Sequence, residues 1–116
     1  MQRMFLRSGM QNMEYKVKFT EKCLEDIEDA CLYINEKLKA ENAANKLRIK
    51  IKDSVKGLST SPEMYSKTEK LDRVKRVYRK IPIDNYVLLY TVDKENKIVY
   101  ISHMYYGGRN YLEGLI

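Results

Sequence analysis

The sequence predicts a single α+β domain. An N-terminal strand and an antiparallel hairpin of two helices precede three strands, and the hairpin packs on one face of a mainly antiparallel sheet. Two stripes of apolar residues recur at helical spacing between residues 23 and 58, whereas after residue 73 the apolar residues alternate as they do in strands. The chain has 116 residues, of which 44% are hydrophobic, and this is enough for one domain with its own core.

The first expected element is a strand over residues 15–19, where apolar and basic residues alternate. Residues 1–13 contain four of the six methionines and lack the apolar stretch of a signal peptide. We therefore expect an unpacked leader, or a start site placed upstream of a natural one at Met13. The domain then comprises residues 14–116.

Two helices should follow this strand. Thr20 is expected to cap the first, over about residues 21–39, with Tyr33 outside its apolar stripe. The second ends near Gly57 and leaves Ile49 exposed. The two stripes consist of Cys23, Leu24, Ile27, Ala30, Cys31, Ile34 and Leu38, and of Ala43, Ala44, Leu47, Ile51, Val55 and Leu58.

The two cysteines lie eight residues apart on the first helix. At the helical rise their positions are about 12 Å apart, beyond the roughly 7 Å that a disulfide tolerates. We expect buried thiols rather than redox or catalytic groups. With no export signal and no apolar run near the roughly 18 residues of a membrane helix, a cytoplasmic protein without a membrane partner is expected.

After a loop over residues 59–70, three strands are expected. They cover residues 74–81, 86–92 and 97–104, with turns at 82–85 and 93–96 between them. The run 86–92 is apolar on both faces and should be the central strand. Gly107 and Gly108 should end the sheet, and a short tail completes the chain.

The positive charge is concentrated in one stretch. The net charge is +6, and residues 67–80 contain seven basic residues against two acidic ones. This stretch should form a basic face for an anionic partner. Alternation places Arg76, Tyr78 and Lys80 on one side of the expected strand, an arrangement that suits a phosphate backbone and a stacked base. The residues expected to bind an anion or a partner are Arg73, Lys75, Arg76, Tyr78 and Tyr106.

His103 is the sole histidine and could be either a general base or a structural residue. The tail brings Tyr105, Tyr106, Arg109 and Tyr111 close behind it, where they could hold a nucleotide or close the sheet edge. Two cysteines and one histidine do not make a usual zinc site, so no metal, cofactor or small-molecule ligand is expected. An RNA-cleaving enzyme, a protein-binding inhibitor and a plain nucleic-acid binder all fit these residues.

The order of elements and several local patterns resemble the RelE/ParE toxin superfamily of bacterial type II toxin–antitoxin systems. The patterns are YKVKFT before an acidic helix, LSTSPEM after the second helix, YVLLYTVDKENKIVYI in the last strands, and the tail YYGGRNY. The matching residues are Tyr86, Tyr90, Val92, Asp93, Gly107, Arg109 and Asn110. Tyr106 stands where the superfamily often has a histidine, and the resemblance covers roughly residues 14–112.

The resemblance implies a toxin that arrests growth, stabilises plasmids and binds an acidic antitoxin. RelE-like members cut mRNA in the ribosomal A site without a metal, whereas ParE-like members inhibit DNA gyrase. An RNase-like site here would consist of Lys80, Arg79, Arg109, His103 and Tyr111. RelE-like enzymes often have an arginine where this chain has Val87, and the long helical hairpin is ParE-like. The resemblance thus favours the gyrase inhibitor, with the endoribonuclease and a non-toxic nucleic-acid binder as alternatives.

Overall fold

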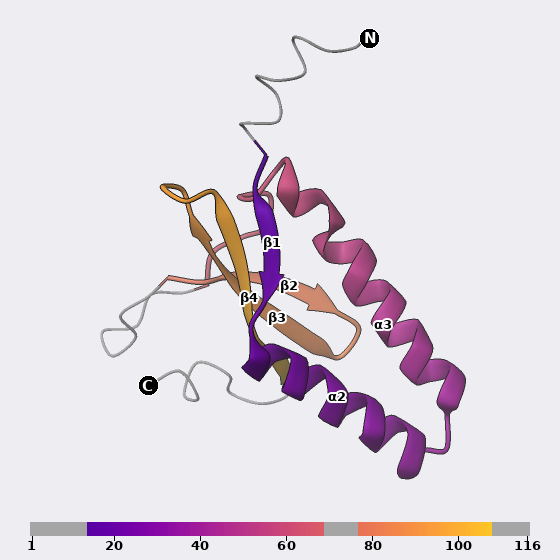
Figure 1. Cartoon of the computed structure of the whole chain (residues 1–116). Helices are drawn as coiled ribbons and strands as arrows, with labels where there is room; N and C mark the ends of the chain where they lie inside the picture. The colour runs from indigo at the N-terminus through magenta and orange to yellow at the C-terminus, as the bar shows by residue number, and fades with distance from the viewer. Residues whose placement is uncertain (1–13, 69–76, 108–116) are drawn as a thin grey trace, which may run out of the picture.

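A computed structural model describes residues 14–68 and 77–107, and in them the predicted order of elements is confirmed (Figure 1). The elements are β1 (Lys16–Phe19), α2 (Glu21–Glu36), α3 (Glu41–Val55), the short 3-10 helix η1 (Lys56–Ser59), β2 (Arg79–Ile83), β3 (Tyr86–Asp93) and β4 (Ile98–Tyr106). The strands lie in the order β1-β4-β3-β2, with β1 parallel to β4 and the other pairs antiparallel. Both helices cover the same face of this sheet, α2 over β4 and α3 over β2 (Figure 1).

Thr20 begins α2, as predicted, and ties it to the sheet. Its Oγ1 accepts a hydrogen bond from the amide of Cys23 at 3.2 Å and donates one to the carbonyl of Ser102 at 3.1 Å. The helix ends at Glu36, earlier than predicted, because the link to α3 turns through Lys39 in the left-handed region (φ 52°).

The buried stripes agree with the prediction except at their margins. Leu24 is 53% exposed and Leu38 is 59% exposed, because Leu24 lies on the flank of the stripe and Leu38 lies beyond the helix end. Ala43, at the start of α3, is also exposed. Ile49 and Tyr33 are exposed, as predicted, and both cysteines are buried free thiols.

The second strand differs from its predicted bounds. It runs over Arg79–Ile83 rather than 74–81, and residues 74–76 of the expected strand lie outside the described residues. Pro82 continues the strand because β2 is an edge strand, where a missing N–H is tolerated. The connecting turn therefore shrinks to Asp84 and Asn85, with Asp84 in the left-handed region (φ 53°) that a two-residue hairpin needs.

β3 is an interior strand, as predicted, and is buried on both faces. Leu88 and Tyr90 are completely buried in the main core under the helices, and Leu89 is completely buried on the other face. That other face carries a smaller cluster of Tyr78, Val87, Leu89 and Tyr105, and we call it the open face because neither helix covers it. No described helix is long and apolar enough to cross a membrane.

Candidate functional site

The open face brings together two of the predicted site residues. In the register of the sheet, Lys80 pairs with Leu89, and Leu89 pairs with His103, so all three lie in one row across β2, β3 and β4. Residues directly opposite in an antiparallel pair share a face. Lys80 and His103 therefore flank Leu89 on the open face.

His103 lies between two tyrosine rings. Its ring centroid is 5.7 Å from that of Tyr78, in an edge-on arrangement, and 5.7 Å from that of Tyr105, in a stacked one. Burial lowers the pKa of His103, although the negative charge of Asp26 acts in the opposite direction. Its Nδ1 is buried and has no hydrogen-bond partner among the described residues. A neutral imidazole with one free nitrogen can accept a proton or a hydrogen bond.

Tyr78 does not offer the free ring that the sequence predicts. It is 9% exposed, because its ring packs in the cluster with Val87 and Leu89 and meets the edge of His103. Its carbonyl also accepts a hydrogen bond from the amide of Thr68 at 2.7 Å. A base could not stack on this ring without rearrangement.

Arg79 points away from Lys80, to the helix-covered face. Its Nη1 donates to the carbonyl of Tyr65 at 2.7 Å and to the carbonyl of Glu63 at 3.2 Å, and Nη2 lies 3.3 Å from the Glu63 carboxylate. Lys94 also pairs with that carboxylate at 3.2 Å, and its hydrogen bond is the main cause of the lowered pKa of Glu63. The Arg79 guanidinium is thus bound to the loop that precedes β2.

The remaining predicted site residues fall in two groups. Tyr106 is 49% exposed and packs edge-on against Tyr86 at 5.7 Å, on the helix-covered face near the β2–β3 turn. In the sheet register Tyr106 lies opposite Tyr86, and Arg79 lies opposite Tyr90, four residues further along β3. Tyr106 is therefore about 13 Å from Arg79 along the strand direction. The others lie outside the described residues: Arg73, Lys75, Arg76, Arg109 and Tyr111.

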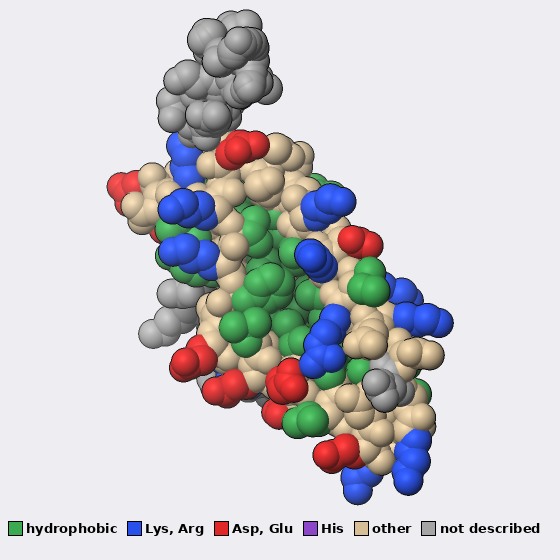
Figure 2. All heavy atoms as spheres, turned by 45° about the vertical axis from the view of Figure 1, so that its right-hand side comes forward, with side chains coloured by type: hydrophobic (Ala, Val, Ile, Leu, Met, Phe, Trp, Pro, Cys, Tyr) green, Lys and Arg blue, Asp and Glu red, His purple; other side chains and the backbone are tan. Residues whose placement is uncertain are grey.

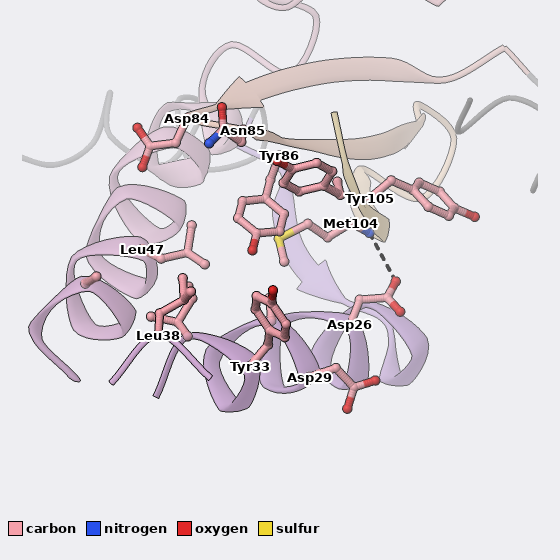
Figure 3. A pocket seen from close by; sticks show the side chains of 14 residues that line it. Asp26, Asp29, Tyr33, Leu38, Leu47, Asp84, Asn85, Tyr86, Met104 and Tyr105 are labelled. Carbon is pink, nitrogen blue, oxygen red and sulfur yellow. Dashed lines mark hydrogen bonds between the residues drawn. The ribbon is translucent and has the colours of Figure 1, made fainter. Parts of the chain in front are cut away.

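A cavity of about 840 Å³, which no sequence pattern predicts, lies between the hairpin, the β2–β3 turn and the end of β4 (Figure 3). Figure 3 shows Tyr33, Tyr86 and Met104 converging on its centre and Asp26 accepting a hydrogen bond from the amide of Met104, which is 3.1 Å long. Within the described ranges 14–68 and 77–107, its lining includes three aspartates but no lysine or arginine. The one available signal was Tyr33, an aromatic residue outside the helical stripe. Among the described residues, no cluster of His, Cys, Asp and Glu could hold a metal ion.

Comparisons with known proteins agree with this architecture. The family described as the ParE toxin of type II toxin–antitoxin system, parDE, matches residues 17–111. A search of curated proteins finds no match. Three solved structures share the fold. The chromosomal ParDE system of P. aeruginosa has a TM-score of 0.62 at 18% identity, with 81% of this chain and 97% of that chain covered.

The other two structures are toxin–antitoxin complexes of the RelBE type. The complex from Mycobacterium tuberculosis has a TM-score of 0.53 at 19% identity, with 81% of this chain and 92% of that one covered. The archaeal complex from Pyrococcus horikoshii OT3 has a TM-score of 0.51 at 16% identity, with 84% and 99% covered. At these identities the structures show a common fold, whereas the family match extends over most of the sequence. The chain belongs to the ParE toxin family of type II toxin–antitoxin systems.

Proposed function

We propose that this protein is the toxin of a type II toxin–antitoxin pair and that it arrests growth by inhibiting DNA gyrase. The observation that carries the choice of target is the separation of Arg79 from Lys80 and His103. Metal-free cleavage of RNA requires a base that takes the proton of the ribose 2′-OH, cations around the attacked phosphate, and an acid for the leaving 5′-oxygen. All of these groups must surround one phosphate, and the Arg79 guanidinium is bound to Tyr65 and Glu63 on the opposite face.

Val87 supports the same choice. It is 7% exposed and belongs to the apolar cluster of the open face, at the position where the RNase branch often has an arginine. A gyrase inhibitor needs a docking surface for a protein and no proton-transfer group, so neither feature counts against it.

Two assays with purified components test the target. Supercoiling by purified gyrase should decrease as the toxin concentration rises, and translating ribosomes mixed with the toxin should show no cleaved mRNA. Expression without an antitoxin should arrest bacterial growth. Normal growth in the presence of soluble, folded protein would instead favour the non-toxic nucleic-acid binder, which predicts salt-sensitive affinity for RNA or DNA.

The second candidate is a ribosome-dependent mRNA endonuclease, and the row formed by Lys80 and His103 favours it. In that case Lys80→Ala, Arg109→Ala and Tyr111→Ala should each lower the cleavage rate about 100-fold or more, because a positioned base or charge typically contributes that much. Binding to the ribosome should survive each single substitution. A-site cleavage that Lys80→Ala abolishes would replace the gyrase proposal.

We also propose an acidic antitoxin, partly disordered when free, as the partner that neutralises the toxin. The concentration of positive charge in residues 67–80 supports this, because complementary charge accelerates the encounter of two proteins. Charge reversal at Arg76 and Lys80 should slow association and weaken its dependence on salt. Unchanged association kinetics would place the interface elsewhere.

A further inference from the structure

The cavity at the end of the helical hairpin is used by neither candidate mechanism, since Lys80 and His103 are not among its lining residues. Its floor is apolar and comes from both helices and β4: Ile34, Leu47 and Met104 line it and are buried. Its volume of about 840 Å³ falls within the roughly 300–1,000 Å³ that is usual for ligand-binding pockets. The cavity is therefore large enough to receive side chains of a partner.

Exposed apolar side chains gather around this cavity. The described residues include eight large apolar side chains that are exposed, and three of these line it: Tyr33, Leu38 and Tyr106. The rings of Tyr33 and Tyr86 converge over Met104 (Figure 3), and Tyr86 packs edge-on against Tyr106. Contiguous exposed apolar groups mark contact sites, and the faces of tyrosine rings attract cations.

Three carboxylates lie at the rim of the cavity, and one of them has no partner (Figure 3). Asp26 pairs with Lys22, and Asp84 pairs with Lys50 at 2.8 Å. Asp29 is exposed and has no ion pair within residues 14–68 and 77–107. A negative charge that the described part of the chain leaves unpaired thus stands beside the tyrosine rings.

The outer face of α2 extends this negative charge. Glu21–Glu36 has six acidic residues against one lysine, a net charge of −5 in a chain of net charge +6. Figure 2 shows acidic side chains along the lower part of the molecule, where α2 lies in Figure 1. Glu28 faces α3 and pairs with Arg48.

Three other acidic residues of α2 are exposed and, at the helical repeat, lie within about 40° of one another around the axis: Glu25, Asp29 and Glu36. Glu25 and Asp29 are four residues apart and repel each other, so the helix itself gains no stability from this arrangement. The surface beside the cavity is therefore complementary to a basic partner.

We propose that this cavity binds an arginine side chain that a partner protein presents between aliphatic residues. The guanidinium would lie over the rings of Tyr33 and Tyr86 and pair with the Asp29 carboxylate, while the aliphatic neighbours would cover Leu38. Arginine suits this site better than lysine, because its planar guanidinium both stacks on aromatic rings and pairs with a carboxylate through two hydrogen bonds.

The identity of the partner rests on the proposed function. Of the two partners proposed above, the antitoxin is acidic, and the outer face of α2 would repel it. The arginine would then belong to gyrase, and the cavity would be a docking site for the target.

A capped tripeptide, Leu-Arg-Leu, tests the cavity without gyrase. Titrated into the ¹⁵N-labelled full chain, it should shift the amide signals of Tyr33, Tyr86 and Tyr106 with a dissociation constant of about 1–10 mM, whereas Leu-Glu-Leu should not. Equal shifts from both peptides, shifts confined to the open face, or none up to about 20 mM would overturn the proposal. Tighter binding of Leu-Arg-Leu by Arg109→Ala would also overturn it, because the chain's own arginine would then be the occupant.

The aromatic contact is tested by supercoiling assays with purified gyrase. Tyr33→Ala should raise the toxin concentration for half-inhibition about tenfold or more, because loss of an aromatic anchor commonly weakens an interface that much. The matched control is Ile49→Ala, which removes an equally exposed apolar side chain from α3 and should leave inhibition unchanged. Urea midpoints equal to that of the wild type should show that both variants are folded.

The charge is tested by a double reversal, Asp29→Lys/Glu36→Lys, which should also weaken inhibition about tenfold. The control Asp53→Lys/Glu95→Lys alters the net charge equally, at exposed positions that do not line the cavity. An equal loss in this control would reduce the effect to net charge and overturn the specific site.

Failure of the inference and failure of the proposed function give different results. If the wild type inhibits gyrase and Tyr33→Ala inhibits it equally well, the function stands and the docking site is refuted. If Leu-Arg-Leu binds with the expected pattern but the wild type leaves gyrase unaffected, the arginine site stands and gyrase is refuted as its partner.

Discussion

Arg79→Ala should destabilise the fold without removing a target-binding group, because the Arg79 guanidinium holds the loop before β2. The side chain is only 16% exposed, and its Nη1 donates the 2.7 Å hydrogen bond to the partly buried carbonyl of Tyr65. A hydrogen bond with a charged donor contributes about 1.5–3 kcal/mol. The ion pair with the Glu63 carboxylate adds little to the free energy of unfolding, because that carboxylate faces water. We therefore expect the free energy of unfolding to fall by about 2 kcal/mol.

Urea unfolding followed by circular dichroism measures this loss. With a denaturant dependence of about 1–3 kcal/mol per molar for a domain of this size, the midpoint should fall by about 1 M at unchanged slope. Lys80→Ala is the matched control, since its side chain lies on the opposite face, and it should shift the free energy by less than about 0.5 kcal/mol. Gyrase inhibition per folded molecule should be unchanged in Arg79→Ala. Wild-type stability combined with lost inhibition would refute the reasoning and make Arg79 a contact residue.

Three further outcomes are expected. Burial lowers the pKa of His103, so just below pH 6.5 the unfolded state binds more protons than the folded state, and the free energy of unfolding should fall as the pH drops through that range. In His103→Gln the urea midpoint should therefore depend less on pH between pH 7 and 5. A pH dependence equal to that of the wild type would contradict this. Burial raises the pKa of Cys23 to about 12, and Cys31 is buried as well. Both thiols should therefore resist an aromatic disulfide reagent at pH 8 until the protein is unfolded. Rapid reaction of the native protein would count against the core packing. Gly107→Ala should cost about 1–3 kcal/mol of stability, because the added Cβ would lie 2.9 Å from the carbonyl oxygen of Asn85. The control is Gly57→Ala, in which the added Cβ would meet only a flexible side chain. Equal urea midpoints for the two variants would refute the clash.

The predicted fold could be read from local patterns because each pattern has a local cause. The stripe from Cys23 to Ile34 recurs with the period of a helix, and Thr20 has the side chain that caps one. The run of β3 is apolar on both faces, which only an interior strand can bury. These features depend on neighbours within a few residues, so no knowledge of the tertiary structure was needed.

The bounds of β2 required the tertiary structure. Pro82 normally indicates a turn, and the sequence pattern predicts one over residues 82–85. An edge position removes the penalty for a missing amide, and burial of Ile81 and Ile83 in the core extends the strand past the proline. Whether a strand lies at an edge depends on the order of strands, which local spacing does not determine.

The candidate site divides in the same way. The sequence by itself determined the family, the basic character of residues 67–80 and the alternation that separates Arg79 from Lys80. Only the tertiary structure decided what each side chain contacts: a loop carbonyl for Arg79 and two tyrosine rings for His103. The physical reason is that spacing along the chain sets the face on which a side chain lies, whereas partners such as Tyr65 for Arg79, 14 positions away, and Tyr78 for His103 come into contact only through the packing of strands and loops.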